Sequence, residues 1–317
     1  MRISRRQFLR TIIVGGYVAG TNFGKLTFAG TADTSKSQEG IGEDTNDIPG
    51  RVEVEDPGPN LPGNIQIKGI GKFNFEANDI SAIRDDIFQP EHFSLFDILV
   101  HLDDREEIDL EYHFARQMNT HVIDSINGKN RWWHTAYYDG GWRERNLFRM
   151  DHYPYKDRTT IKLERKKSSF IEDVYRVFRE EGARRDENDD KIIIPEVVIE
   201  GQKETLEFSN VLIRPHDLRK DVFKPGTVTA IDAILSLGDQ GKLNYELDWK
   251  ESIGSAKIVN SYWVEAINNS VAHGRCGFVY ESGSDNYRFF RGNHIHIPSD
   301  VRVINSPEYE KYFWICI

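Results

Sequence analysis

Apolar and polar residues alternate along two stretches of the chain, residues 64–75 and residues 191–208. Ile65 and Ile67 lie two apart in the first stretch, and Val197 holds an apolar position in the second. A period of two predicts β-strands with one buried face. We therefore expect a pair of strands at the start of each of two structural units.

A helix is predicted after each strand pair, beginning near Ser94 in the first unit and near Thr229 in the second. Asp97 and Asp232 follow three residues later, and apolar residues then recur at helical spacing. This arrangement is a variant of the capping box, so we interpret both aspartates as helix caps. A catalytic carboxylate in each unit is the alternative interpretation.

Aromatic-rich strands are predicted to complete both units. They cover residues 131–138, 158–163, 261–267, 277–280 and 313–317. Two strands, one crossing helix and further strands in a mixed sheet form an α+β architecture.

The two units repeat one another in sequence. Ile83–Pro90 aligns with Leu218–Pro225, and Ser94–Leu99 aligns without a gap with Thr229–Ile234, an offset of 218 − 83 = 135 residues. This period is longer than that of solenoid repeats, so it predicts two tandem domains and no array.

Three motifs of the first unit resemble the β-grasp domain at the carboxyl end of transcobalamin-type proteins: Ser94–Leu99, Ile123–Gly128 and Trp132–Gly140. The third departs from the family, because Tyr137–Gly140 stands where the family has Val-Asn-Gly. The second unit keeps the helix start, Thr229–Ile234. The resemblance implies tandem β-grasp (ubiquitin-like) domains and, more remotely, binding of cobalamin or another small ligand. This chain has no room for the large helical domain that supplies the other half of a cobalamin site in those proteins.

The amino-terminal residues resemble a twin-arginine export signal. Ser4-Arg5-Arg6-Gln7-Phe8-Leu9-Arg10 departs from that motif only at its last cation, and a short apolar run follows. The run is too short to span a bilayer, which needs about 20 apolar residues. The resemblance implies export in the folded state, with the twin-arginine translocase as a partner. Cleavage would leave a periplasmic, cell-surface or extracellular protein, and an uncut signal would tether it.

These patterns together predict five consecutive segments. They are a signal peptide at 1–32, a disordered linker at 33–60, β-grasp domain 1 at 61–168, a charged helical linker at 169–190 and β-grasp domain 2 at 191–317.

Composition narrows the function further. The chain has 317 residues, a net charge of −10 and a pI of about 5.5, which argues against nucleic acid as a partner. No nucleophile elbow, phosphate loop or pair of catalytic carboxylates stands out. The missing motifs favour binding over catalysis, although they do not exclude an enzyme.

A candidate metal site is formed by His294 and His296, which lie two apart and so point to one face of a strand. His273 and Cys276 are additional ligand candidates, and these donors suit zinc or copper. The alternative is a polar strand face with no cofactor. The sequence alignment places Asp151-His152 opposite Asn293-His294.

The two cysteines, Cys276 and Cys316, are predicted to pair in an oxidising compartment. Two buried thiols, or metal binding by Cys276, are the alternatives.

Clustered aromatic residues suggest an interface, because neighbouring rings on one strand face opposite ways, so one ring of each adjacent pair should lie away from the main core. The candidates are Trp132, Trp133, Tyr137, Tyr138 and Trp142. The alternative is that these rings cover one another or the other domain.

The leading interpretation is an exported, non-catalytic protein that binds a protein partner or a small ligand in the cell envelope. The alternative is an accessory or metal-binding subunit of an exported redox enzyme.

Overall fold

The computed structural model describes residues 48–137, 148–254, 256–284 and 297–316, and it shows an α+β fold with mixed sheets. The described α-helices are α2 (Leu95–Asp104), α3 (Ser168–Glu187) and α4 (Asp232–Asp239). The short 3-10 turns are η2 (Ala77–Asp79), η3 (Arg116–Met118) and η4 (Met150–His152). The strands are β1 (Gly63–Ile67), β2 (Gly71–Phe75), β3 (Leu110–Ala115), β4 (Thr120–Ile126), β5 (Trp132–Tyr137), β6 (Thr160–Arg165), β7 (Ile192–Glu200), β8 (Thr205–Ile213), β9 (Tyr245–Lys250), β10 (Ser261–Ile267), β11 (Ser270–Val271), β12 (Cys276–Gly283) and β13 (Tyr309–Cys316).

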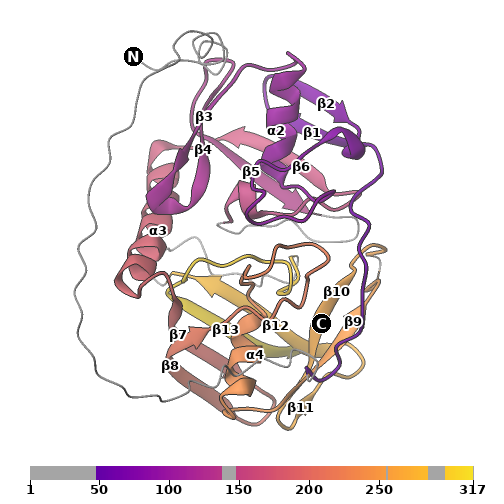
Figure 1. Ribbon diagram of the computed structural model, residues 1–317, viewed down its shortest axis with the longest axis vertical. Helices are drawn as coiled ribbons and strands as arrows, with labels where there is room; N and C mark the ends of the chain where they lie inside the picture. The colour runs from indigo at the N-terminus through magenta and orange to yellow at the C-terminus, as the bar shows by residue number, and fades with distance from the viewer. Residues whose placement is uncertain (1–47, 138–147, 255, 285–296, 317) are drawn as a thin grey trace, which may run out of the picture. The chain divides into compact units, whose positions relative to one another are not determined.

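The first half of the described chain, residues 61–165, contains a four-stranded sheet in the order β2-β1-β6-β5. β1 pairs antiparallel with β2 and parallel with β6, and α2 lies against this sheet (Figure 1). Ile65 and Ile67 of β1 and Phe96 of α2 belong to one buried cluster. The predicted first strand pair is confirmed, and its alternating pattern buries one face of the sheet. β3 and β4 form a separate hairpin.

The second half, residues 191–316, has the same arrangement. Its main sheet has the order β8-β7-β13-β12, with β7 antiparallel to β8 and parallel to β13. β9, β10 and β11 form a separate small sheet. The predicted strand pair at 191–208 is confirmed, although β8 extends to Ile213. β3 and β9 were not predicted, although both sequences alternate apolar and polar residues, as LEYHFA and YELDWK.

The helix caps differ between the two halves. Ser94 forms a complete capping box, in which its hydroxyl accepts from the amide of Asp97 and the carboxylate of Asp97 accepts from the amide of Ser94. In the second half, Asp232 accepts from the amide and hydroxyl of Thr229, but α4 begins only at Asp232. Both aspartates therefore bind the backbone that precedes a helix, which supports the structural interpretation.

Residues 48–60, which we call the strap, correct the predicted disordered linker at 33–60. The remaining linker residues lie outside the described ones. The amide of Leu247 donates to Pro49, and Tyr262 exchanges hydrogen bonds with the backbone of Val52. Polar composition suggested a linker, but these long-range contacts satisfy the strap backbone and fix it on the second half.

The two halves share part of their core. Phe88 and Phe223 occupy equivalent positions in the repeat, form an antiparallel bridge and pack with ring centroids 5.7 Å apart. The amide of Gln89 donates to Val222, and the amide of Lys224 donates to Ile87. Repeated sequence therefore produces a repeated contact across the boundary between the halves.

Helix α3 connects the halves and lies close to the turn η3. A Cβ atom at Gly182 would stand 1.9 Å from the backbone oxygen of Gln117, so only glycine fits there. We expect Gly182→Ala to lower the free energy of unfolding by about 1–3 kcal/mol through overpacking, despite the higher helix propensity of alanine. Urea denaturation measures this loss. Arg179→Ala, at an exposed position of the same helix, is the control, and equal stability of both variants would contradict the contact.

Among the helices that the structure describes, none is both long and apolar enough to cross a membrane. The export signal at 1–32 lies outside the described residues.

Candidate ligand-binding cleft

Arg84 lies at the centre of a buried polar cluster in the first half. Its Nε and Nη2 donate to the two carboxylate oxygens of Asp86, each at 2.7 Å. Its Nη1 donates to the backbone oxygen of Asn119 and to the carboxylate of Asp151 at 3.2 Å. Burial opposes the charge, but the two carboxylates outweigh it and raise the pKa of Arg84.

Arg219 repeats this cluster in the second half. Its Nε and Nη2 donate to Asp221, and its Nη1 donates to the backbone oxygen of Asn260 and to Asp300. Asn119 and Asn260 also share a left-handed backbone, with φ of 49° and 43°.

The repeated arginine clusters correct the sequence alignment. The counterpart of Asp151 is Asp300, because each carboxylate contacts the repeat-equivalent arginine. Asn293, the predicted counterpart, lies outside the described residues. The loops before these aspartates differ in length, so alignment by residue type alone lost the register.

A large cleft lies beside Arg84, with residues from both halves in its lining, and has a volume of about 530 Å³. This volume falls within the range of about 300–1,000 Å³ that is usual for ligand sites. Its apolar surface includes Ile87 of the first half and Val228 and Ile304 of the second. We call it the larger cleft.

The polar floor of the larger cleft is a connected hydrogen-bond network. Asn305 Oδ1 accepts from Asn119 Nδ2 and Arg185 Nη1. Asn305 Nδ2 lies 3.3 Å from His152 Nδ1, and His152 Nε2 lies 2.8 Å from the backbone oxygen of Asn119. With the proton on Nε2, neutral His152 makes both of these bonds, while Arg84 Nη1 also lies 2.9 Å from Nε2.

His152 is neutral for a physical reason. Burial and the neighbouring Arg84 outweigh Asp151 and lower the pKa of His152 to about 3. A histidine that stays neutral from pH 5 to 8 and is engaged at both nitrogens is poorly suited to proton transfer. The network holds the cleft floor in one arrangement instead.

The larger cleft is positively charged although the chain carries −10 overall. Its lining contains four cations and two carboxylates, a balance of plus two. The cations are Arg84, Arg185, Lys191 and Arg214, and the carboxylates are Asp86 and Asp190. A cleft of this sign concentrates anionic ligands.

A smaller cleft, with a volume of about 220 Å³, lies on the strap side of the molecule and is lined partly by strap residues. Asp56 of the strap accepts from Arg219 Nη2 at 3.4 Å, and its other carboxylate oxygen lies 3.7 Å from His92 Nε2. Burial would raise the pKa of Asp56, but His92, Arg219 and Lys156 outweigh it and lower that pKa. The carboxylate is therefore ionised.

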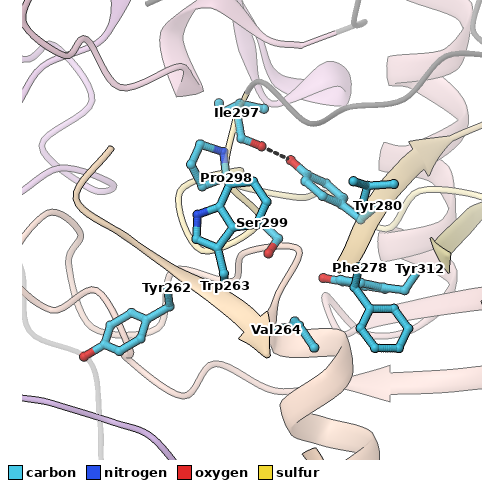
Figure 2. Close-up of a pocket in the computed structure, with 10 residues that line it drawn as sticks. Tyr262, Trp263, Val264, Phe278, Tyr280, Ile297, Pro298, Ser299 and Tyr312 are labelled. Atoms are coloured by element: carbon cyan, nitrogen blue, oxygen red, sulfur yellow. Dashed lines mark hydrogen bonds between the residues drawn. The ribbon is translucent and has the colours of Figure 1, made fainter. Parts of the chain in front are cut away.

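The aromatic residues of the second half surround a third cavity, which is too small for a ligand (Figure 2). Its volume is about 20 Å³, close to that of a single water site. Tyr280 donates to the backbone oxygen of Ile297 at 2.6 Å across it, as the dashed line in Figure 2 marks. These rings form core structure.

The predicted metal site is only partly described. His294 and His296 lie outside the described residues. Cys276 is bonded to Cys316 in a disulfide, so its thiolate is not a metal ligand in this structure, which corrects that assignment. His273 packs beside Trp314. Within the described ranges, no group of three His, Cys, Asp or Glu residues has the arrangement of a metal site.

The disulfide joins directly opposite residues of β12 and β13. β13 pairs with β7 inside the main sheet of the second half, so the bond ties the end of the described chain to that sheet.

Two predicted interface residues are buried. Trp132 belongs to the core of the first half, and Trp133 packs on the other side against Phe170 and Phe178 of α3. The prediction that one ring faces away from the main core is right for Trp133, but α3 covers it. Both rings are therefore ruled out as exposed contacts. Tyr137 is half-buried, whereas Tyr138 and Trp142 lie outside the described residues.

Sequence reasoning missed both clefts. One signal was present: the repeated segments contain Arg84-x-Asp86 and Arg219-x-Asp221 at the same offset. Paired charges kept in both copies point to a shared buried cluster, but the partners Asp151 and Asp300 come from distant segments.

No protein-family model matches this chain, and no curated protein or solved structure is similar enough to be matched with it.

Proposed function

We propose that this chain is an exported, non-catalytic binding protein built from two tandem β-grasp domains, and that its ligand occupies the larger cleft. The single observation that carries the binding site is the cleft of about 530 Å³, lined from both halves and opposite in charge to the whole chain. Export rests on the twin-arginine resemblance at Ser4–Arg10.

Three features of the fold support the domain assignment. In each half, an antiparallel pair is followed by a helix, and a late strand lies parallel to the first strand of that pair. A crossing helix and a parallel final strand are what the β-grasp resemblance implies. The rigid polar floor with a neutral His152 supports binding over acid–base catalysis.

Blocking the larger cleft tests the proposed binding site. Thr227 lines the cleft, so Thr227→Trp should fill it. We expect the exported wild-type protein to release a bound compound or peptide when denatured, and the variant to release at least about tenfold less, as detected by mass spectrometry. Thr205→Trp, at an exposed position on β8, is the control. Equal release from wild type and Thr227→Trp, or no released material from either, would overturn the proposed site.

Replacing Arg5 and Arg6 together by Lys tests the proposed route. We expect the folded protein to accumulate in the cytoplasm, measured by fractionation, because the twin-arginine resemblance rests on this pair. A single Arg10→Lys variant is the control, since it restores the usual cation of the motif. Unchanged export of the double variant would refute the route.

A further inference from the structure

We infer that the ligand of the larger cleft is an extended acidic peptide segment whose carboxylate takes the place that Asp56 of the strap takes in the smaller cleft. This inference rests on the proposed binding function and names the chemistry of its ligand.

The two clefts are equivalent in the internal repeat. The amide of Leu95 donates to Tyr153 in the first half, and the amide of Ala230 donates to Arg302 in the second, which fixes the register of the late loops. With this register, residues that line one cleft correspond to residues that line the other. Such pairs are Asn119 with Asn260, Thr227 with His92, and Asn305 with Lys156.

Different segments of the chain lead into the two halves, so the two clefts are lined by different kinds of segment. The strap enters the first half as an extended segment and places Asp56, Pro57 and Pro59 in the lining of the smaller cleft. The chain enters the second half through α3 instead. Among the described residues, no extended segment like the strap lines the larger cleft, and its greater volume agrees with this difference.

The strap shows which group the repeated site accepts. The Asp56 carboxylate lies between Arg219 Nη2 and His92. The equivalent place lies between Arg84 Nη2 and Thr227. There Arg84 Nη2 donates to Asp86 and to the amide oxygen of Asn119, so a neutral oxygen stands where the second half has the Asp56 carboxylate.

The charges that line the two clefts also favour an acidic ligand for the larger cleft. The smaller cleft contains the carboxylates of Asp56 and Asp157 beside the ammonium of Lys156. The larger cleft has two more cations than carboxylates. A lining of this sign favours an incoming carboxylate, and charge-assisted hydrogen bonds are the strong ones. The proline-flanked backbone of the strap also loses little conformational freedom on binding, which makes it a suitable template.

A synthetic peptide of residues Arg51–Leu61, labelled with a fluorophore, tests the inference by anisotropy against the full chain. We expect saturable binding, and at least about tenfold weaker binding when Asp56 of the peptide is replaced by Asn. In the protein, Lys191→Glu and Arg214→Glu should each weaken binding, whereas Lys203→Glu, in the β7–β8 turn, should not.

A variant that binds the peptide more tightly distinguishes this inference from a loss of binding caused by misfolding. Thr227→His gives the larger cleft the counterpart of His92, so the peptide should bind more tightly than to wild type. The gain should be larger at pH 5.5 than at pH 7.5, because a histidine with a pKa of about 6.5 is charged at the lower pH.

Equal binding of the Asp56→Asn peptide, or binding that Arg214→Glu leaves unchanged, overturns the inference. Release of a neutral compound from wild type but not from Thr227→Trp also overturns it, while the proposed binding function stands. Inorganic phosphate that displaces the peptide at equal concentration would show a site for any anion and would likewise overturn it.

Discussion

Replacing Asp151 by Ala is expected to lower the free energy of unfolding by about 3–5 kcal/mol, because it leaves the buried Arg84 without its inner carboxylate. Asp151 is fully buried, and its oxygens accept from Arg84, from the hydroxyl of Thr120 and from the amide of His121. Removing it leaves several buried donors without a partner. Urea denaturation at pH 7 measures the loss.

Asp86 provides the matched control. It binds the same arginine but is 62% exposed, so Asp86→Ala should cost only about 0–1 kcal/mol. A loss below about 1 kcal/mol for Asp151→Ala would show that the buried cluster does not hold the first half together.

The pH dependence of this stability has a definite sign. Burial would raise the pKa of Asp151, but the charge of Arg84 and the hydrogen bonds from His121 and Thr120 outweigh burial and lower that pKa well below its ordinary value. A lowered pKa stabilises the fold above the unfolded-state value of about 3.9, and this stabilisation is lost as the pH falls below it. The gap in stability between wild type and Asp151→Asn should therefore narrow toward pH 3.

Removing the disulfide is expected to cost roughly 3–4 kcal/mol by the loop-entropy model, since Cys276 and Cys316 are 40 residues apart. The double variant Cys276→Ser, Cys316→Ser should unfold at a lower urea concentration. Hydrogen exchange should rise in β12 and β13, while the β1–β6 sheet keeps its protection, because the bond crosses only the β12–β13 pair.

Wild type with and without reductant is the control for this pair. Reduced wild type should match the double variant, and unfolded, unreduced protein should show no reactive thiol. Two reactive thiols per chain would show that the disulfide does not form in the purified protein.

The sequence predicted the elements whose signals are local. Alternation at 64–75 and 191–208 located two strand pairs, and Ser94 with Asp97 located the start of α2. The second helix begins at Asp232 and not near Thr229, because the segment before it forms a tighter turn with i+3 bonds from Asp232 to Thr229 and from Ala233 to Ala230. Local pattern determines periodicity and caps, but tertiary contacts determine where a helix begins.

Only the tertiary structure decided the clefts and what fills them. Arg84 meets Asp151, and Arg219 meets Asp300 and Asp56, across 67, 81 and 163 residues. No short-range pattern encodes such contacts, since they depend on loop lengths and on parallel pairing at the centre of each sheet. The repeat with its Arg-x-Asp pairs was readable in the sequence. The different routes of the strap and α3, which make one cleft negative and the other positive, follow from the packing of the whole chain.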